Sequence, residues 1–164
     1  MSKKTITDKP AKRMCALYLE TIGYENIMLA GRDEGYDLSA IKNSEKFFFE
    51  VKYSSKKSGK FFGTVMLTEL YQATLKEENY YFIICRGNIA NTNIKDWFFK
   101  IFSFDEFVEC CTLTTPIFHY HLYLDALGRN TRKIEFKEKT TKASRELIKI
   151  MWNDFSSWKK GNNS

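Results

Sequence analysis

The chain contains no apolar run that approaches the length of a membrane-spanning helix and no segment with the pattern of a secretion signal. Its four cysteines include no Cys-x-x-Cys pair, and their spacing matches no zinc site. The adjacent Cys110 and Cys111 are poorly placed to bridge each other. These absences predict a cytoplasmic protein with reduced thiols and no membrane association.

Internal repeats, linker-like stretches, helix-turn-helix patterns and zinc-finger patterns are also absent from the 164 residues. The length predicts a single domain over residues 1–164. A hydrophobic share of 43% beside 28% charged residues is typical of a soluble globular protein. The formal net charge of +6 permits a polyanionic partner but does not require one.

Two predicted strands dominate the first half of the chain. Residues 36–41 and residues 47–52 are apolar or aromatic and are joined by a polar turn. Because side chains alternate along a strand, Glu50 and Lys52 point to one face of the second strand. The opposite face carries Phe47, Phe49 and Val51.

Acidic side chains meet at one end of this predicted hairpin. Asp37 stands at the start of the first strand, where pairing can bring its carboxylate beside that of Glu50. Two carboxylates and the neighbouring Lys52 suit a hard divalent cation, which takes oxygen ligands. Such a cation can polarise a phosphoryl oxygen and lower the pKa of a bound water. A solvated hairpin face is the plainer alternative, but an apolar strand seldom ends in buried charges without a reason.

The spacing of these residues resembles the motif of the PD-(D/E)xK nuclease superfamily. Asp37 is followed by twelve residues and then by Glu50-Val51-Lys52, with Tyr36 where the family's loosely kept proline would stand. The resemblance extends over about residues 10–86 and includes Gly35-Tyr36-Asp37, Phe49-Glu50-Val51-Lys52 and Val65-Met66-Leu67-Thr68 with Glu69. It implies that Asp37, Glu50 and the backbone carbonyl of Val51 hold Mg²⁺, for which Mn²⁺ can substitute. Lys52 would then orient or activate the attacking water.

The resemblance implies an α/β fold with a restriction-endonuclease-like αβββαβ core over about residues 8–102 and a mixed central sheet flanked by helices. The sequence is consistent with this order. The expected elements are a helix from Asp8 that stops at Gly23, a meander of strands at 36–41, 47–52 and 61–67, a helix capped by Thr68, and a buried strand at 80–85. A short extended piece at 27–30 precedes the meander.

The remaining part, about residues 103–160, predicts further strands and an amphipathic helix. Ser103 and Glu106 form a capping box with a Phe102–Phe107 staple at the start of a helix over 104–111. His119 and His121 share one face of a strand over 118–124, and we interpret them as surface or edge-strand residues because no third metal ligand is near. The helix over 144–158 has an apolar stripe that is either core or an interface; the stripe comprises Leu147, Ile148, Met151, Phe155 and Trp158.

Six further residues are weaker candidates for the site. In the resembled family the first helix often carries a glutamate that reaches the metal; its place here is near Arg13, and Glu20 is a substitute candidate. Glu69 and Gln72 begin the helix after the third strand and would support the site, although each also suits a solvated helix start. A loop rich in lysine is equally a solvated turn or a phosphate contact, and its candidates are Lys56, Lys57 and Lys60.

Taken together, these features predict a Mg²⁺-dependent DNA endonuclease that hydrolyses phosphodiester bonds of double-stranded DNA. The chain resembles the small catalytic subunit of heterodimeric type IIS restriction endonucleases, in which a larger partner reads the sequence. A homodimeric restriction enzyme or a junction-resolving nuclease is the nearest alternative. A non-cleaving DNA-binding or assembly module on the same fold, and a protein-interaction module built on the last helix, are the alternatives from other classes.

Overall fold

The structure is a computed structural model that describes residues 8–31, 34–55, 60–114, 117–125, 127–132, 134 and 140–161. Its helices are α1 (Asp8–Thr21), α2 (Leu67–Lys76), α3 (Phe104–Val108) and α4 (Arg145–Gly161), with short 3-10 turns η2 (Glu77–Asn79) and η3 (Ile94–Asp96). Its strands are β1 (Glu25–Leu29), β2 (Leu38–Lys42), β3 (Glu45–Ser54), β4 (Lys60–Val65), β5 (Tyr80–Arg86), β6 (Phe98–Ser103), β7 (Cys111–Thr114), β8 (Ile117–Tyr123) and β9 (Thr141–Lys142).

These strands form two sheets. The first has five strands in the order β1-β2-β3-β5-β6, and it is mixed because β5 runs parallel to β3 while the other neighbours are antiparallel. The second has four antiparallel strands in the order β4-β8-β7-β9. The predicted α/β class with a mixed sheet and helices is therefore confirmed at this level.

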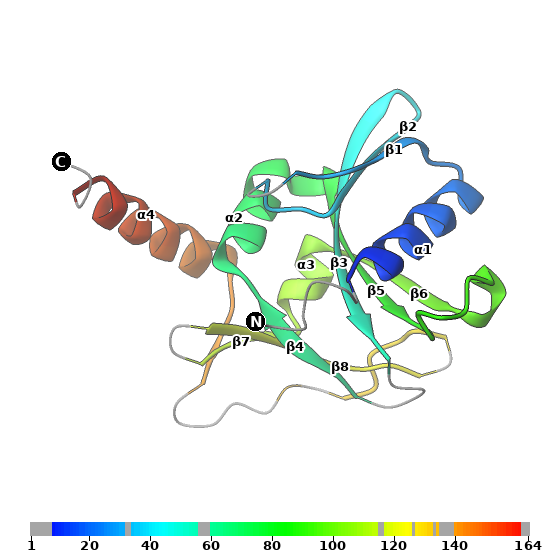
Figure 1. The fold of residues 1–164 in the computed structure, drawn as a ribbon. Coiled ribbons are helices and arrows are strands. Elements are labelled where there is room, and N and C mark those ends of the chain that lie inside the picture. The colour runs from blue at the N-terminus through cyan, green and yellow to red at the C-terminus, as the bar shows by residue number, and fades with distance from the viewer. Residues whose placement is uncertain are drawn as a thin grey trace.

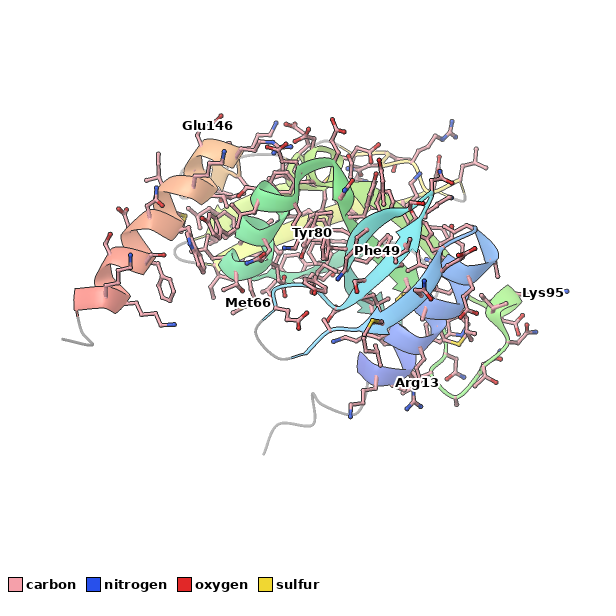
Figure 2. All side chains as sticks on the ribbon, turned by 90° about the horizontal axis from the view of Figure 1, so that it is seen from above. Arg13, Phe49, Met66, Tyr80, Lys95 and Glu146 are labelled. Carbon is pink, nitrogen blue, oxygen red and sulfur yellow. The ribbon has the colours of Figure 1, made fainter. Side chains whose placement is uncertain are left out.

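The first sheet is covered on both faces, and the coverings differ (Figure 1). One face packs against α1, and the other packs against α2, α3 and the second sheet. The central strand β5 is buried on both sides, with Tyr80 and Phe82 in one cluster and Ile83 and Cys85 in the other. Figure 2 shows Tyr80 and Phe49 among the packed side chains of the interior, while Lys95 lies at the periphery.

Local signals explain several element boundaries. Gly23 has a φ of +89°, which ends α1 in the left-handed conformation that favours glycine. Asn43 and Ser44 both have positive φ, as the two-residue turn of a tightly twisted hairpin requires. The capping box of Ser103 and Glu106 is confirmed at the start of α3. Phe102 and Phe107 meet edge to face beside it.

The predicted place of the third strand, in one meander with the first two, is wrong. Residues 61–65 do form a strand, β4, but it pairs with β8 in the second sheet. The meander is instead completed by β1, which pairs with β2. The burial pattern of β4 gives the reason: Phe61 and Val65 are buried while Phe62 is 54% exposed. Such a half-exposed strand suits a sheet with one open face better than a sheet covered on both sides.

Two helix boundaries also differ from the prediction. The N-cap of α2 is Met66 rather than Thr68, which lies inside the helix, and the Met66 N–H donates to the side chain of Glu69. The helix that begins at Phe104 ends at Val108 rather than at Cys111, because Cys111 already pairs with Tyr120 in the second sheet.

The last helix packs on the rest of the chain mainly through its first half. Ile148 is fully buried, Leu147 and Met151 pack against the same core, and Phe155 is 42% exposed. The side chain of Trp158 lies outside the described residues. In Figure 1, α4 begins beside α2 and then extends away from both sheets. None of the helices in the described ranges is both long and apolar enough to cross a membrane.

Candidate active site

The site is built where β2 starts and β3 continues past it. Leu38, the first residue of β2, pairs with Phe49, and β3 extends five residues further to Ser54. Asp37 lies just before β2, and its backbone N–H donates to the Phe49 carbonyl over 2.8 Å. Its carboxylate Oδ2 accepts the Val51 N–H over 2.9 Å. The side chain of Asp37 therefore takes the place that a further β2 residue would have occupied.

This arrangement also orients the backbone carbonyl of Val51. The N–H and C=O of one strand residue point toward the same neighbouring strand. Because the Val51 N–H points to the Asp37 carboxylate, the Val51 carbonyl faces the same side, beyond the end of β2. The carbonyl that the resemblance implies as a ligand thus lies on the side of β3 that Asp37 occupies.

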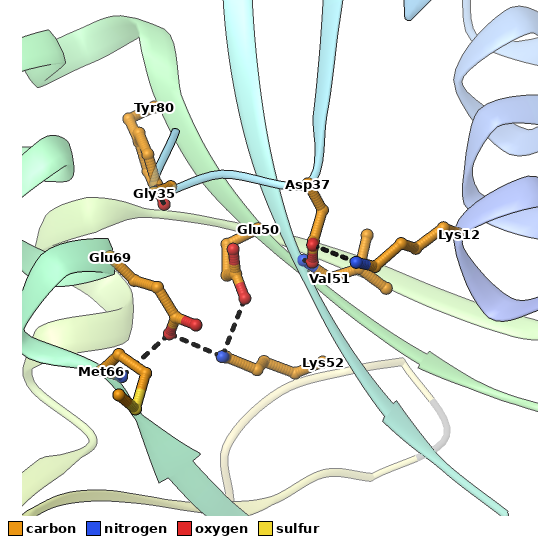
Figure 3. Close-up of polar contacts among 9 residues, drawn as sticks. All are labelled: Lys12, Gly35, Asp37, Glu50, Val51, Lys52, Met66, Glu69 and Tyr80. Carbon is orange, nitrogen blue, oxygen red and sulfur yellow. Dashed lines mark hydrogen bonds and ion pairs between the residues drawn. The ribbon is translucent and has the colours of Figure 1, made fainter. Parts of the chain in front are cut away.

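Glu50 and Lys52 share one face of β3, as predicted, and they meet Glu69 from α2 (Figure 3). The Lys52 ammonium donates to Glu50 Oε1 over 2.9 Å and to Glu69 Oε2 over 2.7 Å. Glu69 Oε2 also accepts the Met66 N–H over 2.9 Å. One carboxylate therefore caps α2 and fixes the lysine of β3, so that the first turn of α2 is tied to the strand.

Burial and charge shift the protonation of these groups. Glu50 is only 6% exposed, and burial raises its pKa well above the ordinary value; the Lys52 ammonium opposes this shift, whereas the charges of Glu69 and Asp37 add to it. Burial by itself would lower the pKa of Lys52, but the carboxylates of Glu50 and Glu69 outweigh it and raise that pKa. Lys52 is therefore a cation at neutral pH.

A second lysine reaches the site from α1. The Lys12 ammonium forms an ion pair with Asp37 Oδ1, on the other oxygen from the one that accepts the Val51 N–H (Figure 3). The sequence did not predict Lys12. The family glutamate was expected near Arg13, one residue further, and Arg13 is exposed. Ala11 and Cys15 are buried and lie four residues apart, so they mark the face of α1 that packs on the sheet. This spacing is the signal in the sequence that could have placed Lys12, next to Ala11, near the site.

The loop that leads to Asp37 is fixed by Tyr80, which the sequence did not predict as a site residue. The buried Tyr80 hydroxyl donates to the Gly35 carbonyl over 2.6 Å. Burial raises the pKa of Tyr80, and the neighbouring carboxylates add to this, so the hydroxyl keeps its proton. Gly35 has a φ of +72°, and a Cβ there would lie 2.5 Å from the side chain of Gln72. Glycine is therefore required two residues before Asp37.

These groups open onto a cleft of about 510 Å³. Its walls come from α1, β3, β4 and the start of α2, with Tyr120 of β8. The polar residues named above that line it are Lys12, Asp37, Glu50, Lys52 and Glu69, and β4 contributes Phe62, Gly63 and Thr64. The three predicted catalytic residues therefore share one solvent-accessible cleft.

The other predicted residues lie elsewhere. Gln72 accepts a hydrogen bond from Lys76 and does not line the cleft. Glu20 is exposed near the end of α1 and does not line it either. Lys60 is exposed at the start of β4, with its ammonium over the Phe62 ring. Lys56 and Lys57 lie outside the described residues.

The donor set of the cleft fits a magnesium ion that keeps part of its water shell. In the described ranges, no group of three or more His, Cys, Asp or Glu side chains is arranged to hold a metal ion. Mg²⁺ does not require such a group, since it commonly takes one or two carboxylates and retains several waters. Asp37 and Glu50 supply two carboxylates, Val51 adds a carbonyl, and the Lys12 ammonium shows that a cation is accommodated at Asp37.

Comparisons of the chain with protein-family models, with curated proteins and with solved structures find no match.

Proposed function

We propose that this protein is a Mg²⁺-dependent DNA endonuclease that hydrolyses phosphodiester bonds. The observation that carries the proposal is the convergence of Asp37, Glu50 and Lys52 in one cleft at the end of the β2–β3 hairpin. A buried carboxylate with a raised pKa beside a second carboxylate and a fixed lysine is a costly arrangement, and such arrangements are concentrated at catalytic sites.

Three residues would supply the oxygen ligands of the metal. Asp37 and Glu50 would each offer a carboxylate oxygen, and Val51 would offer its backbone carbonyl. When bound, Mg²⁺ supplies polarisation of the phosphoryl oxygen and a water of lowered pKa. The hydrogen bond from the Val51 N–H holds Asp37 in place, so this ligand is oriented before the ion arrives.

Lys52 would act on the attacking water and on the charge that develops at phosphorus. It is held by Glu50 and Glu69 on the cleft wall, and its raised pKa keeps it protonated. As a cation it orients the water through a hydrogen bond and offsets the negative charge that gathers on the phosphoryl oxygens. The bond from the water oxygen to phosphorus forms as the bond to the leaving ester oxygen breaks, in line with it; the attacking water releases a proton to solvent, and the leaving oxygen takes up a proton from solvent.

We further propose that the chain is the strand-cutting subunit of a restriction enzyme and that a larger partner reads the DNA sequence. The support is the resemblance in sequence to such small subunits, together with the absence of a helix-turn-helix or zinc-finger pattern from these residues.

A non-cleaving DNA-binding module is a second candidate that one observation favours. Asp37 is paired with Lys12, and Glu50 and Glu69 are both paired with Lys52, so each carboxylate already has an ammonium partner without a metal. A purely structural network of ion pairs would have the same geometry.

Cleavage of supercoiled plasmid separates the two candidates. We expect the wild type to nick the plasmid with Mg²⁺ and not with EDTA, and Asp37→Asn and Lys52→Gln to abolish the nicking. Asp37→Asn is a matched change because an amide oxygen still accepts the Val51 N–H, and Glu20→Gln is the control outside the cleft. Each protein is tested alone and with any larger protein that is encoded next to it. DNA binding without nicking under every condition would establish the non-cleaving module instead.

A further inference from the structure

The outer face of the second sheet carries aromatic and basic side chains that the proposed chemistry does not use. In β4 and β8, Lys60 is opposite Tyr123, Phe62 is opposite His121, and Thr64 is opposite His119. The alternate residues of both strands, such as Phe61 and Phe118, are buried in the core between the sheets. The first set of side chains therefore lies on the face of the sheet that points away from the core.

Phe62 is the centre of this aromatic platform, which we define as Phe62, His119, His121 and Tyr123. Phe62 is 54% exposed, although a large aromatic residue stabilises a fold most when it is buried. The Phe62 ring is stacked on the His119 ring with a centroid distance of 5.3 Å and an interplanar angle of 7°, and the His121 ring lies 5.0 Å from it. Thr112 fixes His121 through a 3.2 Å hydrogen bond. The ring thus packs against two histidine rings while 54% of the residue stays exposed to solvent.

Positive charge lies along the same platform. The Lys60 ammonium is 5.0 Å from the centre of the Phe62 ring and 5.5 Å from that of Tyr123. The Arg132 guanidinium is 4.6 Å from the centre of the Tyr123 ring. Aromatic faces interleaved with cations bind single-stranded nucleic acid, because bases stack on the rings while the cations contact phosphates. An apolar protein partner would leave both cations buried without a counter-charge.

The platform continues directly into the cleft. Phe62 and Thr64 line the cleft that contains Asp37, Glu50 and Lys52, and they also belong to the outer face of the sheet. His119 Nδ1 is buried and has no hydrogen-bond partner within the described residues, a condition that is rare in folded proteins. A strand whose phosphate lies in the cleft can therefore place its neighbouring base over Phe62.

We propose that Phe62 stacks on an unpaired base next to the phosphate in the cleft, so that the preferred substrate contains single-stranded nucleotides. The proposal rests on the proposed nuclease function and adds a substrate class to it. Duplex DNA alone does not offer an exposed base face, since its bases are stacked on one another.

Binding of labelled oligonucleotides without divalent metal tests the proposal. Fluorescence anisotropy compares a thymidine oligonucleotide of about 16 nucleotides with a duplex of equal length. The proteins are the wild type, Phe62→Ala, Phe62→Trp and the control Leu75→Ala, which removes a similarly exposed apolar side chain from α2. We expect about tenfold weaker single-strand binding in Phe62→Ala, near wild-type binding in Phe62→Trp and Leu75→Ala, and little change for the duplex.

Three results would overturn the proposal. Equal single-strand affinity of wild type and Phe62→Ala removes the stacking role, and a preference of the wild type for duplex removes the substrate class. If the molecular mass measured by sedimentation is half as large for Phe62→Ala as for the wild type, the platform is an interface between two copies of the chain. Plasmid nicking by the same proteins separates this failure from that of the nuclease: if nicking persists, only the stacking proposal fails, whereas a wild type that neither nicks nor binds contradicts both.

Discussion

The charge balance of the cleft depends most on Lys52, because its ammonium is the cation that faces two carboxylates. Its ammonium contacts Glu50 and Glu69, and the charge of Asp37 also acts on Glu50. Buried ion pairs contribute little net stability, but removal of one partner leaves a charge without compensation. The loss in free energy of unfolding when Lys52 is removed therefore measures how much the uncompensated carboxylates destabilise the fold.

We expect Lys52→Ala to lower the free energy of unfolding by about 3 kcal/mol at pH 8 in EDTA, measured by urea denaturation. The pKa of Glu50 is already raised in the folded state, and without Lys52 it rises further. Between the unfolded and folded pKa values of Glu50 the folded state binds more protons, so the free energy of unfolding falls as the pH rises through that range. The loss relative to wild type should therefore be smaller at pH 5 than at pH 8.

The double variant Lys52→Ala/Glu50→Gln is the matched control for this charge effect. Its neutral amide would leave no charge to bury at position 50, so the extra loss at pH 8 that Glu50 causes should disappear. A loss in Lys52→Ala that is the same at both pH values would show that Glu50 does not stay buried when its lysine is removed.

In the proposed metal site, Lys12 would compete with the metal ion for Asp37, and its removal should ease metal binding. An ammonium at Asp37 Oδ1 has to move or share the oxygen when a divalent cation binds. We expect Lys12→Met to lower the Mg²⁺ concentration for half-maximal nicking about fivefold, as a partly exposed pair worth roughly 1 kcal/mol implies. Lys9→Met, an exposed lysine of the same helix, is the control. A higher Mg²⁺ requirement would assign Lys12 a direct role in binding the metal or the phosphate.

At the scale of elements, the sequence predicts the features that depend on nearby residues, but not the contacts between segments that are far apart in the chain. The paired strands with Asp37, Glu50 and Lys52, the buried strand β5 and the capping box of α3 follow from alternation and from residues within a few positions of one another. The sheet that β4 joins depends on β8, more than fifty residues later, and no local pattern specifies that partner. The Lys12–Asp37 contact likewise depends on how α1 packs on the sheet.

Besides the buried Ile148, α4 makes an aromatic contact with α2 that can be tested against another residue of the same helix. Trp152 stacks on Tyr71 of α2 with ring centroids 4.4 Å apart, whereas Phe155 is 42% exposed. We expect Trp152→Ala to lower the free energy of unfolding by about 2 kcal/mol and Phe155→Ala by less than about 1 kcal/mol, by urea denaturation. Equal losses would mean that the projecting end of α4 is stabilised as strongly as its base.

At the scale of the whole molecule, the cleft depends on parts of the chain that are far apart in sequence. It is assembled from α1, the β2–β3 hairpin, β4, the start of α2 and Tyr120 of β8, so both sheets contribute to its walls. Glu50 and Lys52 point toward the second sheet, while Asp37 and Lys12 approach from the side of α1. A cation bound there would connect the two sides through Asp37 and Glu50, as the proposed function requires.

Electron paramagnetic resonance of Mn²⁺ tests the binding of this cation most directly, because the signal of the free ion decreases as it binds. We predict that the wild type binds Mn²⁺, that excess Mg²⁺ displaces it, and that Asp37→Asn and Glu50→Gln each weaken binding at least about tenfold. Glu20→Gln, outside the cleft, should bind as the wild type does. Binding of Mn²⁺ that is equal in all four proteins, or absent from the wild type, would contradict a metal site at Asp37 and Glu50.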